Sequence, residues 1–209
     1  MIKTAVKICG ITDYEDARFA AELGVSALGF IFAPSPRQIT PEKAYDIIRA
    51  LPPFVKAVGV FVNERPALIK RIINYCGLDL IQLHGDESPD FCYRLMPYTI
   101  KVLRIKNEES LPTGSSYKGK TRALLLDTYS KYRAGGTGKT FCWEHALKIK
   151  QLGIPVILSG GLGPSNIVGA INTVRPYAVD VNSGVEKRPG KKSHVLMKEL
   201  MEKVNCGAA

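Results

Sequence analysis

Several short apolar runs in this chain end in a polar or ionisable residue, and these residues are the first candidates for chemistry. In chain order they are Cys9, His84, Asp127, Asp180 and Asn182. Cys9 precedes a glycine and lies two residues after Lys7, so on a strand both side chains point to the same side. A nearby ammonium favours a thiolate, which makes Cys9 a candidate base or nucleophile; the alternative is an inert buried thiol.

Asp127 closes the run Ala123–Leu126. A carboxylate at the end of a buried run costs free energy unless something pairs with it or uses it. We therefore expect a functional acid, or else a structural hydrogen bond to a neighbouring loop. His84 is the weaker candidate, because it could simply donate a hydrogen bond to a loop carbonyl.

Two glycine-rich segments could bind phosphate. The segment 135–140 reads Gly-Gly-Thr-Gly-Lys-Thr, but Arg133 stands where a P-loop needs its first glycine. It fits better as the hinge of a mobile lid that follows Asp127. The segment 159–162 and the segment 182–184 both follow apolar runs, and their glycines would let backbone N–H groups approach a phosphate. The alternative is a pair of ordinary tight turns.

These candidates need a framework that gathers the ends of separate apolar runs. Eight runs of strand length lack clean polar alternation, as expected for parallel strands buried on both faces. The eight predicted strands are Ala5–Cys9, Ser26–Phe32, Lys56–Val62, Leu80–His84, Thr99–Ile105, Ala123–Asp127, Pro155–Ser159 and Ala178–Asn182.

Stretches with helical spacing separate the runs. Ala44, Ile47, Ile48 and Leu51 fall at i, i+3, i+4 and i+7, and similar stripes predict seven good helices. The exception is Asn107–Lys120, whose proline, glycines and serines predict a loop or a stunted fifth helix.

Strand followed by helix, eight times, predicts a compact closed (β/α)₈ TIM barrel with its active site at the carboxyl ends of the strands. An open doubly wound sheet is the alternative, but no G-x-G-x-x-G fingerprint follows the first run.

Composition sets broader limits. The chain has 209 residues, 45% apolar and 23% charged, which is ordinary globular composition, and we expect one domain over residues 1–209. No apolar stretch is long enough to span a bilayer, and the N-terminus does not resemble a signal peptide, so we expect a cytoplasmic protein.

Five scattered cysteines without a C-x-x-C pair predict neither a metal site nor disulfides. The net charge of +10 would suit nucleic acid, an anionic membrane surface or a small phosphorylated metabolite.

Taken together and in order, eight motifs at the predicted strand ends resemble the phosphoribosylanthranilate isomerase family. The motifs are Val6–Thr12, Ala27–Phe30 with Ser35–Arg37, Val58–Asn63, Gln82–Glu87, Leu126–Thr128, Gly135–Lys139, Ser159–Leu162 and Val179–Glu186.

The resemblance implies an Amadori rearrangement of N-(5-phosphoribosyl)anthranilate in tryptophan biosynthesis, without metal or organic cofactor. It implies that Cys9 is the general base and Asp127 the general acid. Asp127 would protonate the ring oxygen of the furanose, and a Cys9 thiolate would remove the C2 proton. Asp127 must then be protonated at neutral pH, as burial would favour, and Cys9 ionised, as Lys7 would favour.

The same resemblance implies substrate-binding roles for Arg37, whose fork would hold the anthranilate carboxylate, for Asp180, and with less support for His84. Four residues would hold the phosphate: Gly160, Gly161, Ser183 and Gly184. The expected partner is thus a small phosphorylated substrate, with no nucleic acid and no membrane, and a homodimer is possible.

The chain departs from the family pattern at Cys142, Asn182 and Ser193. The first and third concern helix capping, because cysteine caps poorly and serine well. Asn182 falls at the phosphate end, where it could alter substrate affinity. Two alternatives stay open: a histidine-pathway isomerase of the same barrel group, which would carry aspartate instead of Cys9, and a basic nucleic-acid-binding protein.

Overall fold

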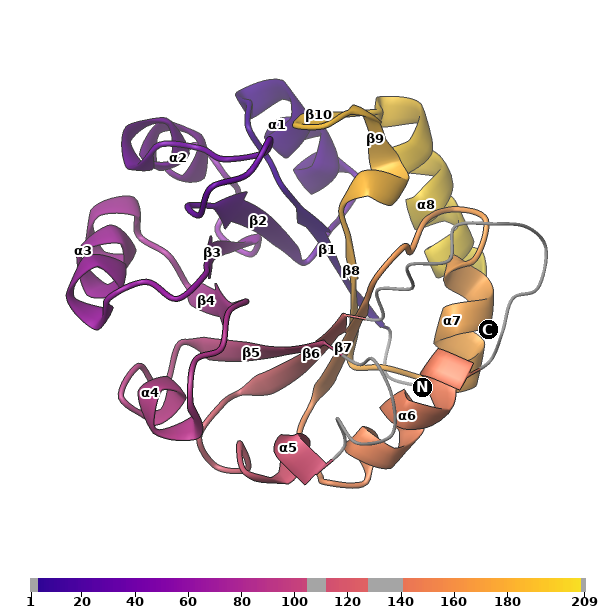
Figure 1. Ribbon diagram of the computed structural model, residues 1–209. Coiled ribbons are helices and arrows are strands. Elements are labelled where there is room, and N and C mark those ends of the chain that lie inside the picture. The colour runs from indigo at the N-terminus through magenta and orange to yellow at the C-terminus, as the bar shows by residue number, and fades with distance from the viewer. Residues whose placement is uncertain (1–3, 105–111, 128–140, 208–209) are drawn as a thin grey trace.

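The computed structural model describes residues 4–104, 112–127 and 141–207. Eight parallel strands close into a barrel in chain order, with β8 paired to β1 (Figure 1). The strands are β1 (Ala5–Cys9), β2 (Ala27–Ile31), β3 (Lys56–Phe61), β4 (Leu80–Leu83), β5 (Thr99–Arg104), β6 (Ala123–Asp127), β7 (Val156–Ser159) and β8 (Ala178–Val181). The predicted TIM barrel is confirmed, and each strand begins and ends within one residue of its prediction, apart from Ile105, which lies outside the described residues.

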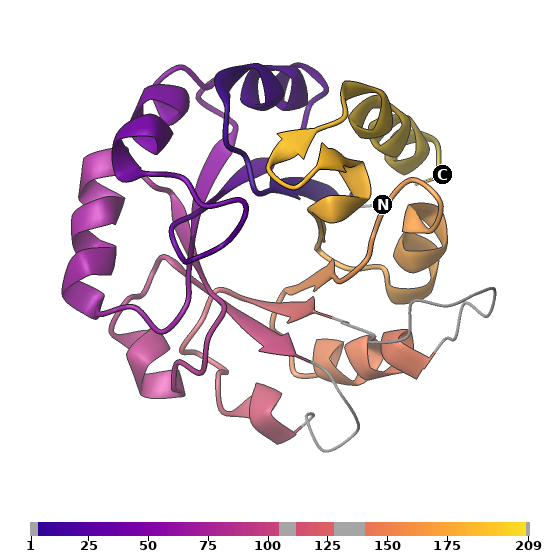
Figure 2. The ribbon, with the colours of Figure 1, turned by 45° about the horizontal axis from the view of Figure 1, so that its top comes forward.

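Helices surround the barrel as an outer ring (Figure 2). They are α1 (Tyr14–Glu22), α2 (Pro41–Ile48), α3 (Pro66–Cys76), α4 (Pro89–Tyr93), α5 (Pro112–Ser115), α6 (Phe141–Lys150), α7 (Ile167–Val174) and α8 (His194–Cys206). Side-chain caps begin four of them: the oxygens of Asp13, Thr40, Ser88 and Ser193 accept backbone N–H groups three residues ahead. At Ser193, the family departure therefore supplies a working cap.

Alternation along the strands divides each strand into an inner and an outer face. A buried cluster of seven residues lies in the barrel interior: Val58, Ile100, Val102, Ala123, Leu125, Ile157 and Ala178. The outward-facing residues pack against the helices in a second, larger core. A charged side chain on the inner face of these strands therefore needs a partner that compensates its charge.

Two helices differ in length from the rest. The fifth, α5, has only four residues, in agreement with the predicted stunted helix. The fourth, α4, has five residues, so it is shorter than a helix spanning Ser88–Met96, the full stretch of helical spacing. A strong N-cap and a proline in the first turn made that stretch read as a longer helix than it forms.

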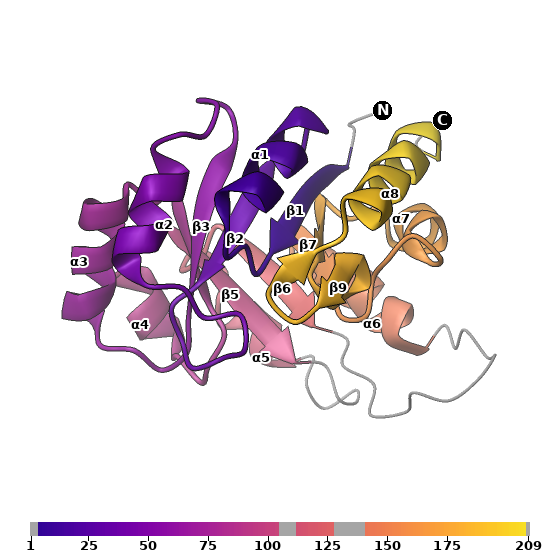
Figure 3. The ribbon, with the colours of Figure 1, turned by 90° about the horizontal axis from the view of Figure 1, so that it is seen from above.

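The connection between β8 and α8 contains an antiparallel hairpin that the sequence did not predict. A short 3₁₀ turn (Ser183–Val185) leads into β9 (Glu186–Arg188), which pairs with β10 (Lys191–Lys192). The hairpin lies between α1 and α8 (Figure 1), at the end of the barrel to which the strands point (Figure 3). It is thus placed to contribute to any site there.

No helix among the described residues has the length and apolar character needed to cross a membrane.

Candidate functional site

A buried polar cluster lies inside the barrel, one layer below the carboxyl ends of the strands. The Lys7 ammonium on β1 contacts the Asp180 carboxylate on β8 at 2.7 Å and the Gln82 side-chain oxygen on β4 at 3.0 Å. All three residues are buried. Asp180 was predicted to face the substrate, but its carboxylate also neutralises Lys7. The ion pair joins the first and last strands.

Cys9 lies on the inner face of β1, one layer above Lys7. A Cβ added at Gly29 on β2 would come within 2.7 Å of the Cys9 sulfur, so the thiol packs against a position that only glycine leaves open. Burial raises the pKa of the Cys9 thiol; the Lys7 ammonium acts against this shift, and the Asp180 carboxylate reinforces it. Lys7 therefore favours the thiolate, as expected, but burial outweighs it and the Asp180 carboxylate adds to the effect of burial.

Asp127 and His84 meet across the barrel mouth. The Nε2 atom of His84 lies 3.5 Å from a carboxylate oxygen of Asp127, and its Nδ1 atom lies 3.2 Å from the side-chain nitrogen of Gln82. The Asp127 side chain is 22% exposed. Arg104, the register partner of Asp127 on β5, donates to the His84 carbonyl at 2.9 Å. These contacts fix the imidazole beside the carboxylate.

Arg37, in the loop after β2, lies at the same end of the barrel and is already paired. Its Nε and Nη2 atoms donate to the two carboxylate oxygens of Glu186 on β9, at 2.9 and 2.7 Å. The Lys192 ammonium on β10 also donates to Glu186 and to Asn182, at 3.0 Å each. Asn182 therefore binds Lys192, which gives the second departure from the family pattern a contact within the protein.

Gly10 connects this charged group to Cys9. A Cβ at Gly10 would lie 2.8 Å from the Asn182 side-chain oxygen and 2.9 Å from Cδ of Arg37, and its φ of +74° favours glycine as well. The residue after Cys9 thus lies directly against the Arg37 and Asn182 side chains.

The two loops predicted to bind phosphate are in contact. A Cβ at Gly184 would lie 2.9 Å from the Leu162 carbonyl carbon and 3.0 Å from the Gly163 Cα, so the loop after β8 packs on the loop after β7. Gly160 and Gly161 have φ values of +92° and +66°. The Ser159 hydroxyl donates to the Asp180 carbonyl at 3.2 Å, which joins the two strand ends. Ser183 is exposed at the same place.

The structure brings forward three residues that were not predicted as site residues, namely Gln82, Glu186 and Lys192. Gln82 and Lys192 are buried polar side chains, and burial is not visible in the sequence. The turn residues Pro189 and Gly190 between two basic pairs were the one signal for a hairpin. The predicted lid at 135–139 lies outside the described residues.

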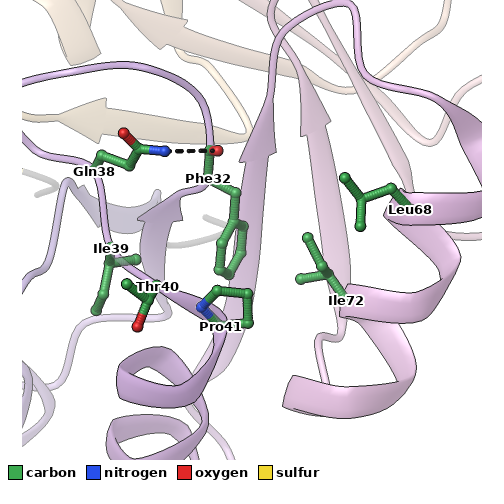
Figure 4. A pocket seen from close by; sticks show the side chains of 7 residues that line it. All are labelled: Phe32, Gln38, Ile39, Thr40, Pro41, Leu68 and Ile72. Carbon is green, nitrogen blue, oxygen red and sulfur yellow. Dashed lines mark hydrogen bonds between the residues drawn. The ribbon is translucent and has the colours of Figure 1, made fainter.

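A separate cavity of about 410 Å³ lies between α2 and α3, outside the barrel (Figure 4). Its lining residues are Phe32, Gln38, Ile39, Thr40, Pro41, Leu68 and Ile72. Since none of the predicted site residues lines it, this cavity is distinct from the candidate site. Within the described ranges, no three His, Cys, Asp or Glu side chains converge as metal ligands would.

A closed parallel barrel with ionisable side chains and glycine loops at the carboxyl ends of its strands defines the class of (β/α)₈-barrel enzymes. The family model described as N-(5'phosphoribosyl)anthranilate (PRA) isomerase matches residues 6–203. The chain therefore belongs to the N-(5'-phosphoribosyl)anthranilate isomerase family.

Individual relatives agree. The N-(5'-phosphoribosyl)anthranilate isomerases of Pelobacter propionicus and Geobacter sulfurreducens are each 49% identical to this chain, covering 96% and 95% of it and 94% and 97% of their own length. Among solved structures, phosphoribosyl anthranilate isomerase from Thermotoga maritima matches with a TM-score of 0.89 at 44% identity, covering 97% of this chain and 99% of that one. A complex of phosphoribosyl anthranilate isomerase with reduced 1-(o-carboxyphenylamino)-1-deoxyribulose 5-phosphate matches with a TM-score of 0.87 at 41% identity, over the same shares of the two chains.

Proposed function

We propose that the protein converts N-(5'-phosphoribosyl)anthranilate into 1-(o-carboxyphenylamino)-1-deoxyribulose 5-phosphate, with Cys9 as general base and Asp127 as general acid. The observation that carries the activity is the family match over residues 6–203, which spans every strand end of the barrel. The assignment of Cys9 and Asp127 rests on the resemblance to the family, and their positions at the carboxyl ends of β1 and β6 support it.

Asp127 begins the reaction by giving a proton to the ring oxygen of the ribose, which opens the ring and leaves a cationic iminium. His84 lies 3.5 Å from this carboxylate. It orients Asp127 and is placed to contact the substrate.

Cys9 then takes the proton from C2, and a second proton shift gives the ketose. Because burial holds the Cys9 pKa above its ordinary value, the thiol is protonated before substrate binds. The iminium formed by ring opening is a new cation, and a cation beside a thiol lowers its pKa. Its formation therefore favours loss of the thiol proton to water, so the base is generated when it is needed.

Arg37 binds the anthranilate carboxylate, and the phosphate is bound by Gly160, Gly161, Ser183 and Gly184. The contact between the two glycine loops supports a single phosphate site formed by both. Asp180 influences the substrate chiefly through Lys7, with which it forms a buried ion pair.

The decisive experiment is a turnover assay with purified protein and the fluorescent substrate, without added cofactor. Loss of substrate fluorescence is the expected result. Cys9→Ala and Asp127→Asn should each lose activity while circular dichroism shows a folded barrel. Full activity in either variant would remove that residue from the mechanism, and no turnover by the wild type would refute the function.

A histidine-pathway isomerase is disfavoured by Cys9, at the position where that enzyme carries aspartate. A nucleic-acid-binding role loses support at the hairpin, since Lys191 binds Asp13 and Asp16, and Lys192 binds Glu186. Salt-sensitive retention on heparin would favour that role instead.

We propose further that residues 1–209 form one domain and that the protein works in the reducing cytoplasm, where Cys9 stays a thiol. We also propose a homodimer, and Phe54, which is 91% exposed in the loop between α2 and β3, is a candidate for its interface. A solved structure of monomers generated from dimeric phosphoribosylanthranilate isomerase from Thermotoga maritima, 40% identical with a TM-score of 0.86, shows that one relative is described as dimeric.

A further inference from the structure

Glu186 and Lys192 form a buried charged unit on the β9–β10 hairpin. The Glu186 side chain is 4% exposed and that of Lys192 is fully buried. Burial alone would raise the pKa of Glu186, but hydrogen bonds from Arg37 and Lys192 outweigh it and hold the pKa below its ordinary value. The carboxylate is therefore a permanent anion shared by two cations.

We propose that Glu186 is a positioning residue that holds the Arg37 guanidinium in the orientation needed to bind the substrate carboxylate, and that Lys192 holds Glu186 in turn. The inference rests on the proposed role of Arg37. It adds to that role the two residues that make the arginine a prepared binding group.

The geometry supports this arrangement. An arginine in a loop has many rotamers, and ordering it during binding costs free energy. Glu186 removes that freedom in advance, because the two-pronged contact fixes the plane of the guanidinium. Within the part of the chain that the structure describes, these bonds use Nε and one hydrogen of Nη2, which leaves three of the five N–H donors for a ligand.

Glu186 is itself fixed from several sides. Besides Lys192, the Gly190 N–H donates to Glu186 at 3.3 Å. The hairpin is tied to α1 by the buried Asp16 carboxylate, which accepts from the Lys192 backbone N–H at 2.8 Å and from the Lys191 ammonium at 3.0 Å. Helix α1 therefore fixes the position of the hairpin, and the hairpin fixes the position of Arg37.

The charges also fit an anionic ligand. Two cations, Arg37 and Lys192, face one carboxylate, so the unit carries one excess positive charge. Lys192 is buried, and Arg37 is 20% exposed at the barrel end that holds Cys9. Arg37 is therefore the group through which the excess positive charge of this unit reaches a ligand.

The test is a kinetic comparison of Glu186→Gln with wild-type protein. Because charged hydrogen bonds contribute on the order of 1.5–3 kcal/mol, we expect KM to rise about 10-fold or more while kcat changes less than about 3-fold. Lys192→Met should behave in the same way. Lys187→Met is the matched control, since Lys187 is an exposed lysine on the same hairpin, and its KM should equal that of the wild type.

Inhibition by inorganic phosphate, which competes at the glycine loops, distinguishes a positioning role of Glu186 from a merely structural one. Its inhibition constant should not change in Glu186→Gln. If Glu186→Gln does not fold, Glu186→Asp keeps the charge with a shorter reach, and it should still raise KM, to a smaller extent. A KM within about 2-fold of wild type in both variants would overturn the inference.

A double-mutant cycle with Arg37→Met tests whether Glu186 acts through Arg37. We expect Arg37→Met and the double variant to have the same KM within about 2-fold. Additive effects would overturn the inference and leave the proposed role of Arg37 intact. An unchanged KM in Arg37→Met alone would instead refute the role of Arg37, and the inference with it.

Discussion

The contact between the two glycine loops makes Gly184→Ala the most direct test of the phosphate site. The added methyl would lie 2.9 and 3.0 Å from two backbone carbons, of Leu162 and Gly163, and closer still to the Leu162 carbonyl oxygen. Atoms in ordinary contact with a methyl carbon are about 3.5–4.0 Å away, and the carbonyl oxygen is the tightest contact, so one loop must move by more than about 1 Å. Backbone cannot rotate out of the way as a flexible side chain can.

Overpacking of this kind costs about 1–3 kcal/mol, and we expect a loss of about 3 kcal/mol in the free energy of unfolding. The movement also displaces the N–H groups proposed to bind phosphate. We therefore expect KM for the substrate and the inhibition constant of inorganic phosphate to rise together, by about 10-fold if 1.4 kcal/mol of binding is lost.

Urea unfolding followed by circular dichroism gives the stability, and steady-state kinetics gives the other two quantities. Gly153→Ala is the control: its φ of +73° makes the substitution strained, but among the described residues no atom lies within 4 Å of the added methyl. It should lose about 1–2 kcal/mol of stability with no change in KM. If Gly184→Ala keeps the wild-type unfolding free energy and phosphate inhibition, the reasoning about the loop contact is wrong.

Three further predictions concern other parts of the molecule. Asp180→Asn leaves the Lys7 ammonium without its carboxylate, so the Cys9 pKa should fall. Alkylation of Cys9 by iodoacetamide at pH 7.5, followed by mass spectrometry, should then accelerate about 3-fold for each 10-fold gain in thiolate, because a less basic thiolate is a weaker nucleophile; an unchanged rate would contradict this coupling. Gly161→Asp places a negative charge in the phosphate loop and should raise KM; an unchanged KM would reject that loop assignment. Phe54→Glu should convert a dimer into monomers in light scattering, with turnover per subunit retained, whereas an unaltered mass would exclude Phe54 from the interface.

The barrel could be predicted from the sequence because its strands are continuous apolar runs separated by helical stripes. Ala123–Asp127 shows this, since both its limits and its terminal carboxylate follow from the pattern alone. The hairpin Glu186–Lys192 could not be predicted in the same way. Its strands are short and charged, and contacts with Asp16 and Arg37, remote in the chain, support it.

The state of Cys9 shows a second limit. Spacing reveals that Lys7 shares a strand face with Cys9, and from that pair alone a thiolate is the natural expectation. The compensating carboxylate of Asp180 lies 173 residues beyond Lys7 in the chain and reaches it only through barrel closure. Burial of the thiol raises the Cys9 pKa most, and this distant carboxylate adds to the shift, and neither is visible among the neighbours of Cys9 in the sequence.

The ion pair between β1 and β8 also matters while the chain is being made. A ribosome adding roughly 5–20 residues per second takes on the order of 10–35 s to pass from Lys7 to Asp180. During that interval the Asp180 carboxylate that pairs with Lys7 has not yet been synthesised. Burying Lys7 then would leave an uncompensated ammonium in an apolar interior. The first strand is thereby kept hydrated until the last one emerges, which disfavours premature closure of a seven-stranded intermediate on the ribosome.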